Sequence, residues 1–163
     1  MRVCVRKSVD TSFFDLNTAK DQLKKLERDY AKLQLDPGDV DTTLSFFVTA
    51  AHLPEWIKDV RYKKCLQNHE LIIQICDELS NCGKHGKSDR KNPAVLHTEY
   101  DGWVSRGWVS RGWVQVILRV TLTTEAAQTL GLESQKTDTL ELATRALEFW
   151  KAHPAFQGGE AIA

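Results

Sequence analysis

Apolar side chains recur at three- and four-residue steps between residues 12 and 34, and no other feature of the sequence constrains the fold as strongly. An α-helix turns once in about 3.6 residues, so this spacing puts the apolar side chains on one face. The face between them is charged, and we interpret it as a solvated face. We predict a helix over residues 12–34, built on Phe13, Leu16, Ala19, Leu23, Leu26, Tyr30 and Leu33.

Three further segments show helical spacing, and they predict helices over residues 40–59, 66–82 and 138–152. Pro54 lies inside the second segment, where its missing N–H predicts a kink or a break. Gly83 suits the end of the third helix, because glycine accepts the left-handed conformation that often follows a helix. We expect short connections between these helices.

The composition changes between residues 94 and 123, where valine, threonine, tryptophan and tyrosine dominate. Such residues are enriched in strands, and we predict a β-hairpin over about 94–123. The fold class is therefore mainly α: a four-helix bundle with a β-hairpin inserted before the last helix. At 163 residues the chain fits a single domain spanning 1–163.

The charges balance, because 22 Lys and Arg residues face 22 Asp and Glu residues. This balance argues against a dedicated nucleic-acid or membrane-surface protein, although it leaves a local basic patch open. The sequence contains neither a stretch of about 20 apolar residues nor the apolar core of a signal peptide. We interpret the four cysteines (Cys4, Cys65, Cys76 and Cys82) as reduced thiols in a cytoplasmic protein, with two disulfides as the alternative.

Cysteine and histidine also occur at spacings that zinc ligands use, at Cys65 and His69 and again at Cys82 and His85. A helix over 66–82 would hold His69 and Cys82 about 20 Å apart at about 1.5 Å of rise per residue. The two pairs therefore do not form one site, and we expect no metal and no cofactor. Cys82 beside His85 is also a poor nucleophile, since the end of a helix disfavours a thiolate.

A tandem repeat is the most unusual feature of the chain: Gly-Trp-Val-Ser-Arg occurs twice from Gly102, and Gly112-Trp113-Val114 begins a third copy. In one continuous strand Trp103 and Trp113 would share a face and Trp108 would point the other way. Tryptophan and arginine are common anchors of protein interfaces, and they also stack on unpaired bases. The alternatives are a hairpin packed against the helices and a neutral duplication. The candidate binding residues are Trp103, Arg106, Trp108, Arg111 and Trp113.

Two strings resemble a loosely defined group of small bacterial helical-bundle proteins without an established activity. They are Phe46 to Trp56, which contains the Thr-Ala-Ala-His run, and Cys76 to His85, which is similar to an Asn-Gly-x-Lys-His motif with one extra residue or a shifted register. A Gly-aromatic hairpin and a helix ending in Phe149-Trp150 complete the likeness over about residues 40–152. The resemblance implies a helical bundle with a hairpin.

A more distant resemblance is to HEPN domains, helical bundles that often act as dimeric RNA endonucleases. Their signature is an arginine followed, after four to six residues, by a histidine near a helix start. This chain departs from it, because Glu78, Leu79 and Ser80 stand where His85 needs the arginine, and Pro93 interrupts the segment from Arg90 to His97.

Two functions follow as hypotheses. The first is a non-enzymatic interaction or regulatory module that binds a protein partner, or a second copy of itself, through the Trp/Arg hairpin. The second is an HEPN-like RNA endonuclease, or a degenerate relative, with a site at the end of the third helix. An imidazole beside a lysine can act as a base near a phosphate. The catalytic candidates are Asp77, Asn81, Lys84 and His85, and His52 if the second and third helices are neighbours.

Overall fold

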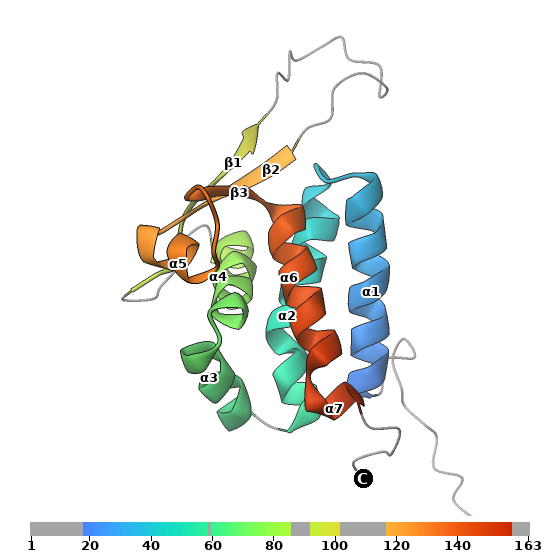
Figure 1. The fold of residues 1–163 in the computed structure, drawn as a ribbon. Coiled ribbons are helices and arrows are strands. Elements are labelled where there is room, and N and C mark those ends of the chain that lie inside the picture. Colours follow the sequence, from blue (N-terminus) through green and yellow to red (C-terminus); the bar gives the residue numbers. More distant parts are fainter. Residues whose placement is uncertain (1–17, 59, 86–91, 102–116, 158–163) are drawn as a thin grey trace, which may run out of the picture.

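The computed structural model describes residues 18–58, 60–85, 92–101 and 117–157. Within these residues the chain is mainly helical, as the sequence predicts, and it carries a small antiparallel sheet of three strands where a two-stranded hairpin was expected (Figure 1). The elements are α1 Ala19–Leu35, α2 Val40–Ile57, α3 Val60–His69, α4 Leu71–His85, β1 Val95–Asp101, β2 Ile117–Leu122, α5 Thr124–Thr129, β3 Lys136–Asp138, α6 Thr139–Ala152 and α7 Pro154–Gln157.

The first helix begins later than residue 12, because Thr18 has an extended backbone with φ −132° and ψ 160°. The Thr18 hydroxyl accepts the Asp21 N–H at 3.2 Å, and the Asp21 carboxylate accepts the Thr18 N–H at 3.1 Å. This capping box satisfies backbone donors that the first turn leaves without helical partners. The predicted start at residue 12 was therefore wrong, and residues 12–17 lie outside the described part of the chain.

The second helix is continuous through Pro54, so the break considered there does not occur. Proline removes only its own N–H from the helix, and the turn that follows remains hydrogen-bonded. The Pro54 carbonyl accepts the Lys58 N–H at 3.1 Å. Leu53 and Pro54 are both buried, so packing also holds this end of α2.

The predicted third helix over 66–82 was wrong in its bounds, because two helices occupy this region. α3 ends at His69 and α4 begins at Leu71, with Glu70 between them. The Glu70 N–H closes α3 on the Leu66 carbonyl at 2.8 Å, while the Glu70 carbonyl accepts N–H groups from the start of α4. α4 also continues through Gly83 to His85, so Gly83 does not end it.

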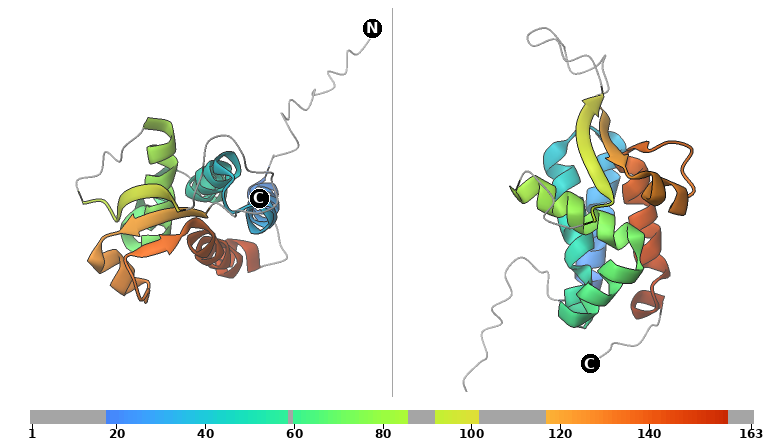
Figure 2. Two further views of the ribbon diagram at one scale, coloured as in Figure 1. Left: turned by 90° about the horizontal axis from the view of Figure 1, so that it is seen from above. Right: turned by 90° about the vertical axis from the view of Figure 1, so that its left-hand side faces the viewer.

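The core lies between the long helices and the inner face of the sheet. α2 packs against both α1 and α4, and α6 contacts all three of these helices (Figure 2). The largest fully buried side chains include Leu26, Phe46, Phe47, Leu53, Ile73, Ile75, Leu142 and Trp150. Trp56 departs from this pattern, because 46% of its surface is exposed although it follows the apolar spacing of α2.

The predicted hairpin corresponds to β1 and β2, which pair antiparallel, and β3 adds a third strand next to β2. Val120 and Leu122 are fully buried and fix β2 to the helices. The register breaks between Val95 and His97, where an irregularity of the β-bulge type occurs. At the other end of the pairing, Asp101 lies opposite Ile117.

Candidate functional site

The five binding candidates of the Trp/Arg repeat (Trp103, Arg106, Trp108, Arg111 and Trp113) lie outside the described residues. The strands on both sides of the repeat are described. Asp101 and Ile117, between which the repeat lies in the sequence, are paired across the β1–β2 ladder. This end of the ladder extends beyond the ends of the neighbouring helices in both Figure 1 and Figure 2.

The sheet of β1, β2 and β3 has a buried face and a polar face. Side chains directly opposite each other in an antiparallel pair lie on the same face, and Glu99 lies opposite Arg119. Glu99 also forms an ion pair with Lys136 of β3, so β1 and β3 are joined by charge across the polar face. Leu96 of β1 is apolar but does not belong to the buried face, since 57% of its surface is exposed. The base of the hairpin is thus held by packing on one face and by charge on the other.

The α4 candidates are only partly described. The Asn81 side-chain amide donates to the Asp77 carboxylate at 3.3 Å, so these two lie together on one face of α4. Lys84 and His85 belong to the last turn of the same helix, but their side chains lie outside the described set. The pair of Asp77 and Asn81 is held by its own hydrogen bond.

The thiols of α4 do not resemble activated nucleophiles. Burial, together with the negative charge of Glu78, raises the pKa of Cys82 above its ordinary value. Burial also raises the pKa of the fully buried Cys76 thiol, with a smaller contribution from Asp77. The two cysteines therefore remain protonated thiols at neutral pH, which argues against a thiolate nucleophile here. Cys65, Cys76 and Cys82 are free cysteines.

His52 joins a polar cluster between α2 and α3, which are neighbours. The Lys63 ammonium lies 2.8 Å from a Glu55 carboxylate oxygen and 3.1 Å from His52 Nδ1. His52 Nδ1 also lies 3.2 Å from the same Glu55 oxygen, so the three side chains meet at one point. Burial alone would raise the pKa of Glu55, but the hydrogen bonds and charges of Lys63 and His52 outweigh it and hold this pKa below its ordinary value.

The polar groups of this cluster are hydrogen-bonded to one another, and these bonds hold α2 to α3. Lys63 is the most sheltered member, with 12% of its side chain exposed, while Glu55 is 35% exposed. Because the Lys63 charge is already paired with Glu55, little of it is left for an anionic ligand.

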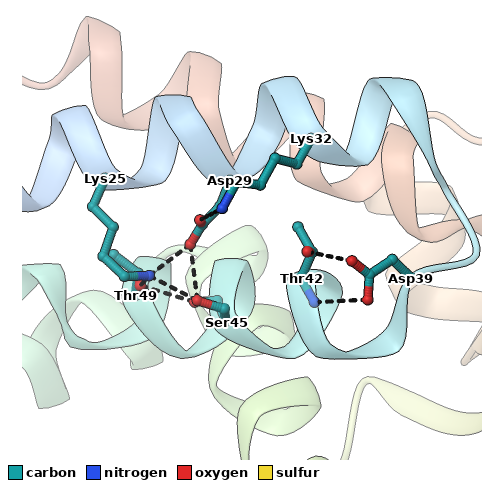
Figure 3. A network of polar contacts seen from close by, with 7 residues as sticks. All are labelled: Lys25, Asp29, Lys32, Asp39, Thr42, Ser45 and Thr49. Carbon is teal, nitrogen blue, oxygen red and sulfur yellow. Dashed lines mark hydrogen bonds and ion pairs between the residues drawn. The ribbon is translucent and has the colours of Figure 1, made fainter.

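A second polar network, between α1 and α2, was not predicted from the sequence (Figure 3). The Lys25 ammonium donates to Asp29 at 2.6 Å and to the Ser45 and Thr49 hydroxyls at 2.8 Å each. The Ser45 hydroxyl in turn donates to Asp29 at 2.9 Å. All three ammonium hydrogens thus have acceptors, so the network is a satisfied link between two helices and not a reactive centre.

The interpretation of the charged face of α1 as solvated was therefore wrong for Lys25, whose side chain is 25% exposed and pairs with Asp29, which is 9% exposed. A signal was present in the sequence. Lys25 and Asp29 are spaced by one helical turn, and so are Ser45 and Thr49 on the next helix. Only the packing of the two helices shows that these pairs face each other.

In the part of the chain that the structure describes, no group of three or more His, Cys, Asp or Glu side chains is arranged to hold a metal ion. Among the same residues, no helix combines the length and the apolar character that crossing a bilayer requires. No family model, no curated protein and no solved structure matches this chain. The likenesses to the small bacterial bundle proteins and to HEPN domains therefore stay predictions.

Proposed function

We propose that this chain is a non-enzymatic interaction module that binds a protein partner, or a second copy of itself, through the Trp/Arg repeat. One observation carries the proposal. The repeat lies in the sequence between Asp101 and Ile117, which are paired at the end of the ladder that extends beyond the helices. Tryptophan and arginine are enriched among the residues that contribute most to protein binding.

The base of the hairpin supports this role, because binding residues are most effective on a rigid support. Val120 and Leu122 are buried against the helices, and the ion pair of Glu99 with Lys136 braces the polar face. In this proposal α1, α2, α4 and α6 act as a four-helix bundle that carries the hairpin, and the protein works in the cytoplasm. Cys65, Cys76 and Cys82 form no disulfide in the described part of the chain, as expected of a protein that works there.

The test is a double variant of the full chain, Arg106→Ala with Trp108→Ala. It should keep the circular dichroism spectrum and melting temperature of the wild type, but lose most partner recovery in quantitative affinity capture from the native cells. Sedimentation velocity tests the self-association branch with the same protein.

The matched control is Arg28→Ala with Leu35→Ala, which removes one arginine and one large apolar side chain from the exposed surface of α1. Leu35 is 86% exposed and Arg28 is also exposed. The control should behave as the wild type. If the hairpin variant also gives wild-type capture and wild-type sedimentation, the proposal is rejected.

A competing proposal is an HEPN-like RNA endonuclease that uses α4. It is supported by the continuation of α4 to His85, because Asp77, Asn81 and His85 then recur at four-residue steps along one helix. The test is RNA cleavage by the pure protein beside a His85→Ala variant. Activity that disappears in the variant supports the enzyme, whereas equal activity in both, or none in either, rejects it.

A further inference from the structure

α3 is unusual in its charge. Between Val60 and His69 it contains an arginine and two lysines but no aspartate or glutamate, in a chain whose net charge is zero. Arg61 and Lys64 are exposed, and Lys58, just before the helix, is exposed as well. Asp59 is the one acidic residue between Lys58 and His69, a stretch that also contains one arginine and three lysines, so the turn and α3 together carry a net positive charge on a neutral protein.

Two exposed apolar residues lie at the same turn. The contacts of Lys63 with His52 and Glu55 align α3 alongside the last turns of α2. Trp56 lies one turn after His52 on α2, and Val60 lies about one turn before Lys63 on α3. Both residues are therefore closer to the connection between the two helices. Their surfaces are 46% and 57% exposed. We call Trp56, Lys58, Val60, Arg61 and Lys64 the α2–α3 corner.

The basic side chains of the corner differ in how far they are already engaged. Lys63, just behind it, is paired with Glu55. The Lys58 ammonium lies 4.9 Å from the centre of the Tyr62 ring, a cation–π contact that leaves its charge uncompensated. Within the described ranges, Arg61 and Lys64 have no carboxylate partner. The corner thus combines free positive charge with an exposed indole ring.

We propose that the α2–α3 corner binds single-stranded nucleic acid, with the Trp56 indole stacking on an unpaired base and Arg61 and Lys64 contacting phosphates. Base stacking on aromatic side chains beside a basic track is the common way to hold a single strand without reading its sequence. Arg61 and Lys64 are about one helical turn apart, so both can follow one backbone. An acidic peptide would use the same charges but has no base for the indole.

The test uses the full chain and a fluorescein-labelled oligouridylate of about 15 nucleotides, a length that covers the usual site of a single-strand binder. Fluorescence anisotropy at low salt should show binding that weakens as salt is added. Trp56→Ala should weaken binding about fivefold or more, as expected for the loss of one stacked base. Arg61→Ala with Lys64→Ala should also reduce the salt slope by about 2.

The matched control is Lys20→Ala with Arg28→Ala, which removes the same two charges from the exposed face of α1. It should bind the oligonucleotide as the wild type does. Equal weakening by this control would show that only the overall charge matters and would overturn the proposal. No binding at low salt would overturn it as well.

Two further outcomes separate this site from other binders. A labelled polyglutamate peptide that binds as tightly, with the same dependence on Trp56, would identify an acidic protein partner and refute the nucleic-acid site. The Arg106→Ala/Trp108→Ala variant should bind oligouridylate normally, because it leaves every residue of the corner unchanged. If that variant alone loses the oligonucleotide, the binding belongs to the hairpin and the corner is excluded.

Discussion

The carboxylate of Glu78, in the middle of α4, accepts the backbone N–H of Val95, the first residue of β1, at 2.8 Å. The same carboxylate accepts the Ala94 N–H at 2.8 Å and the Gln74 side-chain amide at 2.8 Å. Glu78 is fully buried. A buried carboxylate is tolerated only where hydrogen bonds replace its water, and here they also fix where the first strand begins.

Replacing Glu78 with alanine should destabilise the chain by about 3 kcal/mol, because the buried N–H groups of Ala94 and Val95 lose their acceptor. Glu78→Gln should cost less than the alanine variant, since it keeps one acceptor oxygen. Urea unfolding gives the free energies, and hydrogen exchange at the Val95 amide tests the cause. The control is Glu133→Gln on the exposed surface. A Glu78→Ala chain as stable as this control would contradict the assigned role.

Two ion pairs of α1 should differ in strength because they differ in exposure. The Lys25–Asp29 pair is sheltered, at 25% and 9% side-chain exposure, whereas Lys151–Glu27, which joins α6 to α1, is 53% and 43% exposed. Double-mutant cycles with alanine should give a coupling of about 1 kcal/mol or more for the first pair and below about 0.5 kcal/mol for the second. Equal couplings would show that shelter from solvent does not strengthen the first pair.

The stability of the protein should fall as the pH drops below about 7, because His153 is held neutral in the folded state. Burial, and then the charge of Lys58, lower its pKa below the ordinary value. The Ala155 N–H donates to Nδ1, and Nε2 lies 2.6 Å from the Tyr62 hydroxyl. The unfolded chain takes up its proton near pH 6.5, above the folded pKa, so acid favours unfolding over this interval.

His153→Phe keeps a ring against Trp150 but cannot titrate, so its melting temperature should vary less between about pH 7.5 and 5.5. The control is His69→Gln, an exposed position that should retain the wild-type slope. An unchanged slope in His153→Phe would assign the acid sensitivity to other groups.

The three described thiols should react in the order of their exposure. Cys65 is exposed, Cys82 is half-buried and Cys76 is buried, and burial raises the pKa values of the last two. In a Cys4→Ser chain, a thiol reagent followed by peptide mass spectrometry should label Cys65 first and Cys76 only on unfolding. Rapid labelling of Cys76 in the native chain would show that α4 opens locally.

Much of the helical structure follows from local spacing, and α6 shows why. Asp138 predicts a helix start, and its carboxylate does accept the Glu141 N–H, at 2.6 Å. The Glu141 side chain does not return to the cap, however, but binds Thr137 and Arg145. The cap at Asp138 depends on two residues three apart in the sequence. The partners of the Glu141 side chain depend instead on which donors the packing places nearby.

The errors arise where distant residues decide the outcome. The apolar spacing from Leu66 to Ile72 passes through Glu70 without a visible break, so two helices resemble one. β3 has only three residues and exists because β2 lies beside it. The burial of Glu78 and the exposure of Trp56 likewise depend on where β1 and α3 lie, which periodicity along one helix does not specify.

The pairing of Asp101 with Ile117 holds together the two strand ends between which the repeat lies in the sequence. Once two strand ends are held together, the chain between them can grow at little entropic cost, since doubling a flexible loop costs only about 0.6 kcal/mol. Replication slippage could therefore add or remove a Gly-Trp-Val-Ser-Arg unit while the core stays the same. The number of tryptophans, and with it the valency of the hairpin, is a quantity that evolution or a protein engineer can adjust without redesigning the helices.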